Sequence, residues 1–310
     1  MKRPTRTRRP VVTGGAAVEC CPQDCAQMRA DLARLKEIQN EHRLSEAVYE
    51  RDDAKRAEML KGTGFTEVTN EAALNQMGLT TQDLKPTDSN FRAGVFENAQ
   101  GETVVAFKGT DFTSLEDWKN NIGQDIQGGS DYYTRAQDIA YSMNQSGAQP
   151  SFTGHSLGGG LASAAARRIG ADASTFNAAG LNPDTLVGRM PGGNIDRVYV
   201  KGDIVTGIQV GPVSKAASDK DWALDPPSGI GNWLKRNAAG GAGGLLGGLG
   251  GGAAGGLAGP GGALIGSRAG RAAGSKTARG VVLHLNSAIK QSLIDEHDRL
   301  ENEIAQKCGP

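Results

Sequence analysis

The stretch that most constrains this chain is Gly154-His155-Ser156-Leu157-Gly158, a serine with a glycine two residues before it and another two residues after it. The residues that lead into it, PSFTGH, are typical of a strand, and those that follow, LGGGLASAAARR, are typical of a helix. A strand that turns sharply into a helix leaves no room for side chains at the flanking positions, which accounts for both glycines. The pattern therefore predicts a fold that layers helices on a sheet.

Ser156 is the candidate nucleophile of this turn. In the G-x-S-x-G arrangement the serine adopts a strained backbone conformation that presents its hydroxyl at the edge of the sheet. The alternative is a serine in a glycine-rich turn with no chemical role. A serine hydroxyl is a weak nucleophile, so the first interpretation also requires a histidine base and an acid that orients the base.

Two of the four histidines are candidates for the base. In α/β hydrolases the order along the chain is serine, acid, histidine, which puts the base after Ser156. We expect His284, because it follows the strand-like run GVVL and precedes a helix. The alternative is His297, in the charged helix DEHDRLENE, where the spacing from Leu293 and Leu300 favours a packed structural histidine.

Asp203 is the candidate acid, because it comes directly after the strand-like run DRVYVKG; the alternative is an ordinary turn aspartate. An oxyanion hole needs hydrogen-bond donors aimed at the charge that develops on a substrate carbonyl oxygen. We expect one donor to be the backbone N–H of Leu157. The other should come from Thr110, which follows a glycine at the end of an apolar strand. We expect neither a metal nor a cofactor, since no carboxylate cluster suits calcium.

The chain divides into four parts. Residues 1–25 are basic and contain prolines and cysteines, which predicts a disordered tail. Residues 26–236 form the hydrolase core with an N-terminal helix, residues 237–276 a glycine-rich apolar insert, and residues 277–310 the end of the core with His284. The predicted fold is an α/β-hydrolase with a mostly parallel central sheet, an N-terminal helix and a glycine-zipper helical insert.

Apolar periodicity predicts the elements of the core. Residues 24–61 have helical spacing, and we expect one helix that ends at Gly62. The run FRAGVFENAQGETVVAFKGT predicts a β-hairpin. The predicted strands are Ala93–Phe96, Thr103–Phe107, Ala173–Asn177 and Ile195–Val200.

Composition excludes some functions. The 34 basic and 34 acidic side chains balance, so the chain lacks the excess of positive charge that is typical of nucleic-acid-binding proteins. The four cysteines, Cys20, Cys21, Cys25 and Cys308, fit no standard zinc pattern, and we favour unpaired thiols over a disulfide. The basic N-terminus lacks the apolar core of a secretory signal peptide. We therefore expect a chain that is cytoplasmic in the producing cell and exported, if at all, by a dedicated secretion system.

The segment Asn237–Ser267 contains no charged side chain, and its glycines recur every four residues. On a helix that period lines up the glycines and allows two helices to approach closely, as in a glycine zipper. Glycine costs a helix in water about 1 kcal/mol relative to alanine, so such a helix suits a membrane. Pro260 would divide it into two arms. We expect a membrane-contacting or lid hairpin; a disordered low-complexity insert is the alternative.

Together these motifs resemble the class 3, or fungal-type, lipases over residues 90–207 and 280–295. The runs V-x-F-K-G-T, D-W, G-H-S-L-G-G and G-D-x-V occur in that order. The resemblance implies Ser156 as nucleophile, Asp203 as acid, His284 as base and Thr110 in the oxyanion hole. Lys108 stands where the family usually has arginine, and the insert lengthens the stretch between acid and histidine.

Bacterial proteins that look like this are often antibacterial phospholipase effectors of type VI or related secretion systems, accompanied by an immunity protein. The resemblance thus implies a carboxylic ester hydrolase that cleaves acyl esters of membrane phospholipid through an acyl-enzyme. Its partners would be a phospholipid membrane and an immunity protein. Two other hypotheses are an esterase for small soluble esters and a membrane-inserting glycine-zipper toxin on an inactive scaffold.

Overall fold

The computed structural model describes residues 22–109, 131–209, 215–229 and 283–309. A seven-stranded sheet forms its centre. The strands are β1 (Phe65–Glu67), β2 (Ala93–Asn98), β3 (Thr103–Phe107), β4 (Ser151–His155), β5 (Ala173–Phe176), β6 (Ile195–Val200) and β7 (Lys220–Leu224). They lie side by side in the order of the sequence; β1, β2 and β3 run antiparallel, and β3 to β7 run parallel. The mostly parallel sheet confirms the predicted α/β class.

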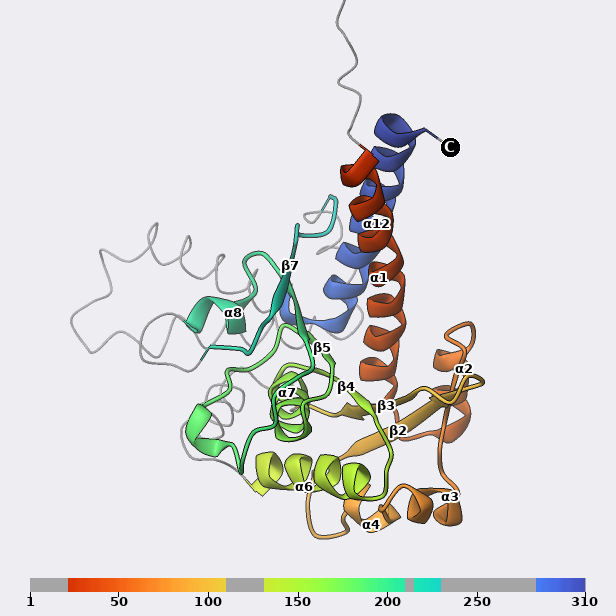
Figure 1. The fold of residues 1–310 in the computed structure, drawn as a ribbon, viewed down its shortest axis with the longest axis vertical. Helices are drawn as coiled ribbons and strands as arrows, with labels where there is room; N and C mark the ends of the chain where they lie inside the picture. The colour runs from red at the N-terminus through yellow and green to blue at the C-terminus, as the bar shows by residue number, and fades with distance from the viewer. Residues whose placement is uncertain (1–21, 110–130, 210–214, 230–282, 310) are drawn as a thin grey trace, which may run out of the picture.

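Helices cover both faces of this sheet (Figure 1). Alternate residues of β3 face opposite layers, since Val105 and Phe107 pack with one set of helices while Val104 and Ala106 pack with the other. The first set is α6 (Asp131–Gln145) and α7 (Leu157–Ile169). On the other face, Val104 and Ala106 pack with α1 (Pro22–Ala47), and α12 (Asn286–Cys308) packs beside α1 over β5 to β7. The shorter helices are α2 (Asp53–Leu60), α3 (Glu71–Gln76), α4 (Thr81–Leu84), the 3-10 turn Pro183–Thr185 and α8 (Ile204–Ile208).

The N-terminal region differs from the prediction of one helix over residues 24–61. α1 begins at Pro22, inside the segment expected to be disordered, and ends at Ala47. A second helix starts after Asp52, whose carboxylate accepts a hydrogen bond from the backbone N–H of Lys55 at 2.9 Å. This side-chain cap satisfies a backbone donor that a new helix leaves unpaired, so it favours a break at this point. The prediction of a single helix is therefore wrong.

A disulfide joins Cys25 near the start of α1 to Cys308 at the end of α12, so the expectation of unpaired thiols is wrong for these two. The two helices lie side by side (Figure 1) and bring the two Cα atoms within 5.6 Å. A separation of 283 residues in the sequence hides this proximity. Cys20 and Cys21 lie outside the described residues.

The glycine-rich insert, residues 237–276, also lies outside the described residues. Within the part of the chain that the structure describes, no helix is both long enough and apolar enough to cross a membrane.

Candidate active site

The turn at Ser156 has the geometry that the sequence predicts. β4 ends at His155 and α7 begins at Leu157, so one residue makes the turn from strand to helix. The backbone of Ser156 has φ 60° and ψ −125°, a conformation that residues with side chains rarely adopt. Strain of this kind persists only where the surrounding structure holds it, and it is concentrated at functional sites.

The glycines on either side of Ser156 have a steric explanation. A Cβ atom at Gly154 would lie 2.2 Å from the carbonyl oxygen of Gly158. A Cβ atom at Gly158 would lie 2.1 Å from the carbonyl oxygen of Phe107 at the end of β3. The ends of β3 and β4 and the first turn of α7 therefore meet with no space for even a methyl group.

Hydrogen bonds hold the strained residue in place. The backbone N–H of Ser156 donates to the carbonyl of Phe176 at 2.9 Å, at the end of the neighbouring strand β5. The carbonyl of Ser156 accepts from the N–H groups of Gly159 at 3.0 Å and Ala179 at 2.9 Å. The Ser156 hydroxyl is buried and has no hydrogen-bond partner among the described residues. Buried polar groups without a partner are rare, and each calls for an explanation.

Asp203 and His284 form a buried pair. Asp203 follows β6, and one of its carboxylate oxygens lies 2.6 Å from Nδ1 of His284. The other carboxylate oxygen accepts a hydrogen bond from the N–H of Thr206 at 2.7 Å and so caps α8. Both oxygens have partners, which fixes the orientation of the carboxylate. An ionised carboxylate accepts hydrogen bonds, so the pair holds the imidazole in the tautomer that carries its proton on Nδ1.

His284 lies against the turn that carries Ser156. The Nε2 atom of His155 lies 2.7 Å from the backbone carbonyl oxygen of His284, and the two ring centroids are 4.7 Å apart. Ser156, Asp203 and His284 thus come from three chain segments that meet where the parallel strands end. In open α/β sheets this carboxyl edge is where functional residues gather.

Electrostatics in this cluster keep the ring of His155 neutral. Burial, together with the nearby His284, lowers the pKa of His155 well below its usual value. A carbonyl oxygen only accepts hydrogen bonds, so the Nε2 atom of His155 carries the proton in its contact with His284.

Of the two candidate oxyanion donors, Leu157 and Thr110, the structure describes Leu157. Leu157 is the first residue of α7, and its backbone N–H lies at the positive end of the helix dipole. Thr110 lies outside the described residues. Gly109, directly before it, donates its N–H to the hydroxyl of Tyr49 at 2.9 Å. A Cβ atom on Gly109 would lie 2.6 Å from the carbonyl oxygen of His155, so the end of β3 contacts the turn itself.

His297, the alternative base, lies on α12 well away from the turn. It follows Asn286, the first residue of the helix, by eleven positions, or about 16 Å at roughly 1.5 Å per residue. Its ring lies 3.5 Å from carboxylate oxygens of Asp298 and Glu301 on the helix surface. Across the described ranges these three residues form the one group with spacing suited to a metal ion, and none of them contacts Ser156 or Asp203.

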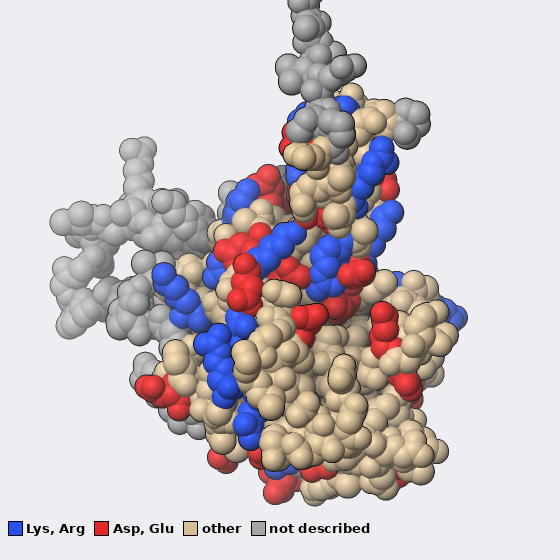
Figure 2. Space-filling view, in the orientation of Figure 1, with Lys and Arg blue, Asp and Glu red and all other residues tan. Residues whose placement is uncertain are grey.

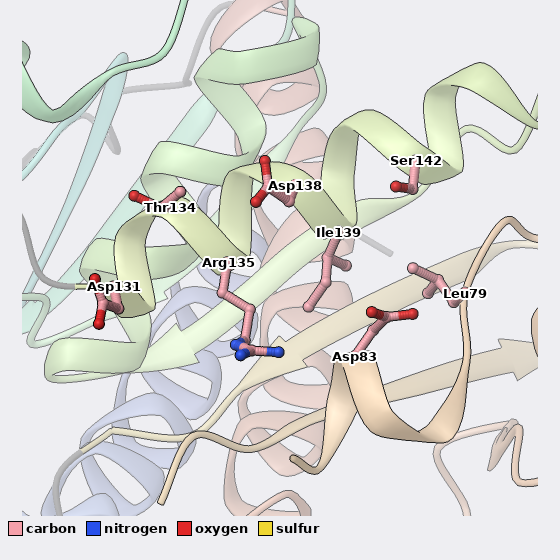
Figure 3. Close-up of a pocket in the computed structure, with 8 residues that line it drawn as sticks. All are labelled: Leu79, Asp83, Asp131, Thr134, Arg135, Asp138, Ile139 and Ser142. Carbon is pink, nitrogen blue, oxygen red and sulfur yellow. The ribbon is translucent and has the colours of Figure 1, made fainter. Parts of the chain in front are cut away.

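Two hollows in the described surface lie apart from this cluster. One, of about 360 Å³, lies between α4 and α6 and is lined by Asp83, Asp131, Arg135 and Asp138 among others (Figure 3). The other, of about 770 Å³, crosses the amino ends of the parallel strands. On the face shown in Figure 2, acidic and basic side chains are interspersed. Neither is lined by Ser156 or His284, so we do not assign them to the candidate site.

Sequence reasoning missed three residues around the site: Tyr49, His155 and Asn177. Tyr49 belongs to the predicted long helix, and only the break after Ala47 turns it toward the end of β3. The sequence assigns His155 no role of its own beyond its place in the motif before Ser156. Asn177 was interpreted as the end of a strand, although it has φ 42°, a conformation for which asparagine is one of the preferred residues.

The family comparison defines the class of this protein. A family model described as a Tle-like phospholipase domain matches residues 40–272, most of the chain. The chain thus belongs to the Tle-like phospholipase domain family. The match includes Ser156 and Asp203 and ends before His284.

One curated relative is the extracellular phospholipase A1 of Serratia liquefaciens. The chain is 37% identical to it over 124 residues, which are 40% of this chain. The matched stretch spans 38% of the length of that relative.

Proposed function

We propose that this protein hydrolyses acyl esters of phospholipids with Ser156 as nucleophile, His284 as base and Asp203 as the acid that orients the base. The observation that carries the proposal is the hydrogen bond between Asp203 and His284 beside a strained serine turn. Family membership supports the substrate class.

In the proposed reaction, His284 Nε2 takes the proton of Ser156 Oγ as that oxygen attacks the ester carbonyl carbon. The negative charge moves to the carbonyl oxygen, which the N–H of Leu157 and Thr110 would stabilise. When the tetrahedral intermediate collapses, the ester bond breaks and His284 gives its proton to the departing glycerol oxygen. Asp203 stays ionised throughout and stabilises the imidazolium that forms.

Water then completes the cycle. His284 removes a proton from a water molecule, whose oxygen attacks the acyl carbon on Ser156. The acyl–serine bond breaks, a fatty acid leaves, and the proton returns from His284 to Ser156. The net reaction consumes one water and yields a fatty acid and a lysophospholipid, with no oxidation or reduction.

Ser156→Ala tests the nucleophile. Loss of a triad member typically lowers the rate by a factor on the order of 10⁴ to 10⁶, and the fold should persist because one hydroxyl is removed. Ser163→Ala is a matched control: Ser163 is also buried, on the same helix, but its hydroxyl donates to the carbonyl of Gly159 at 2.9 Å. Fatty acid release from phospholipid vesicles should vanish in the first variant and persist in the second. Substantial release by Ser156→Ala would refute the role of this serine.

We also propose that the glycine-rich insert brings the enzyme to the lipid surface. Support comes from the sequence: the insert lies between Asp203 and His284, its residues Asn237–Ser267 carry no charged side chain, and its glycines recur every four residues. Replacing Gly248 and Gly252 with leucine should block close approach of its arms. Hydrolysis of phospholipid in vesicles should fall, while hydrolysis of a short soluble ester persists. Equal rates of phospholipid hydrolysis in vesicles by the variant and the wild type would show that the insert is a passive linker.

We propose finally that the protein acts as an antibacterial effector in an oxidising compartment of a target cell, opposed by an immunity protein in the producer. The disulfide between Cys25 and Cys308 supports this setting, since such bonds persist in the bacterial periplasm and are rare in the cytosol. Directing the chain to the periplasm of a test bacterium should be toxic, and Ser156→Ala should not be. Toxicity of both would instead favour a membrane-inserting toxin.

A further inference from the structure

Two buried side chains hold the segment that carries His284, and neither is a member of the proposed triad. His155 reaches the backbone carbonyl of His284 with Nε2 at 2.7 Å. Asn177 donates its Nδ2–H to the carbonyl of Leu283, the residue before, at 2.9 Å. The carbonyl groups of Leu283 and His284 thus each contact a side chain at the end of a different strand, β5 or β4. Both side chains are almost fully buried, where a hydrogen bond is stronger and its loss more costly.

Asn177 also connects to the segment that carries the acid. Its Oδ1 accepts from the N–H of Val200 at 3.0 Å, and its own N–H donates to the carbonyl of Val198 at 2.9 Å. The carbonyl of Val200 in turn accepts from the N–H of Asp203 at 2.9 Å. One side chain therefore links the end of β6, which leads to Asp203, with residues 283–284, which precede α12 and include His284.

His155 and the residue before Asn177 also adjoin the strained Ser156. Phe176, directly before Asn177, accepts the N–H of Ser156 through its carbonyl at 2.9 Å, and His155 is the residue directly before Ser156. The hydrogen bonds of residues 155, 176 and 177 thus connect all three segments of the candidate site. The φ of 42° at Asn177 supports the same view, because such conformations are retained where the surroundings require them.

We propose that Asn177 and His155 are positioning residues that fix His284 relative to Asp203 and Ser156 by holding the backbone of residues 283–284. This rests on the proposed function for its catalytic consequence, although the effect on the His284–Asp203 pair is independent of turnover. Misplacement of a catalytic group by about 1 Å can cost on the order of 100-fold in rate. We therefore expect loss of either bond to lower kcat by roughly 10- to 100-fold, with little change in KM.

Paired substitutions at His155 separate positioning from packing. His155→Gln keeps an N–H donor at a similar reach, whereas His155→Phe keeps a ring of similar shape and removes the donor. Positioning predicts near wild-type kcat for the glutamine variant and a low kcat for phenylalanine. A role in packing alone predicts the reverse order, and that order would overturn the proposal.

At Asn177 the substitution that keeps the shape of the side chain is Asn177→Asp. The aspartate keeps an acceptor for Val200 but presents an oxygen in place of the Nδ2–H donor to the carbonyl of Leu283, so the bond to the base segment is replaced by repulsion. The control is Thr175→Val, an equally buried position on β5, two residues before Asn177 in the chain, whose hydroxyl has no partner among the described residues. We expect kcat to fall in Asn177→Asp and to stay at the wild-type value in Thr175→Val. Equal kcat in all three proteins would overturn the proposal.

A spectroscopic measurement keeps this test separate from the proposed function. The proton on Nδ1 of His284 should give a low-field ¹H resonance through its hydrogen bond to Asp203, even in a Ser156→Ala background. We expect His155→Phe and Asn177→Asp to shift or broaden this resonance and His155→Gln to retain it. An unchanged resonance in both of the first two variants overturns the positioning role. Absence of phospholipid hydrolysis by the wild type would refute the proposed function alone.

Discussion

Replacing Gly158 with alanine should separate the end of β3 from the turn at Ser156. The added Cβ would lie 2.1 Å from the carbonyl oxygen of Phe107 and 3.0 Å from the amide nitrogen of Gly109, where ordinary contacts begin at 3.4 Å. To relieve the overlap one backbone must move by roughly 1 Å, and a shift of that size at a reacting centre can lower a rate on the order of 100-fold.

The free energy of unfolding should change less than the activity does. Inserting a methyl group into a closely packed site typically costs about 1–3 kcal/mol, which a stable domain survives. The assay is kcat on a short-chain ester, with urea unfolding measured alongside. Gly207→Ala is the control, because a Cβ there would meet no atom of the described residues within 4 Å. Wild-type kcat in a folded Gly158→Ala would refute the idea that close approach of β3 to the turn is required.

Three further predictions concern the histidines and the disulfide. His284→Ala should abolish ester hydrolysis while His297→Ala retains it; the opposite result would move the base to His297. Burial lowers the pKa of His42 from 6.5 to about 3 in the folded protein. Between pH 6.5 and pH 3 the unfolded chain therefore binds a proton at this histidine that the folded protein does not bind. The free energy of unfolding should then fall by about 1.4 kcal/mol per pH unit, and His42→Gln should reduce that slope in urea titrations; an unchanged slope would contradict it. Reducing the bond between Cys25 and Cys308 should lower the free energy of unfolding by roughly 2–5 kcal/mol, whereas a Cys25→Ser variant should not respond to reductant.

Features that depend on neighbouring residues could be predicted from the sequence. The turn at Ser156 was predictable because its glycines, its strand and its helix lie within one short stretch. The hairpin of β2 and β3 was predictable from two apolar runs around a turn. β7 was missed, because KDWAL is short, begins with two charged residues and buries only Trp222 and Leu224.

Features that depend on distant segments could not be predicted in the same way. Nothing near Cys25 in the sequence indicates that α1 lies beside α12, and the disulfide follows from that packing. The order of the strands in the sheet, which brings Asn177 between the segments of the acid and the base, is likewise a property of the whole fold. Asp203 and His284 were predicted by chain order and local pattern, whereas their contact at 2.6 Å required the structure.

The most direct test of the proposed mechanism is the location of a covalent adduct after treatment with a fluorophosphonate, which reacts with activated serines as an ester substrate does. We expect one adduct, found by tandem mass spectrometry on Ser156, that phospholipid vesicles compete away and that His284→Ala prevents. An adduct on another residue, or continued release of fatty acid by protein that is fully labelled on Ser156, would contradict the assignment of this serine as the nucleophile.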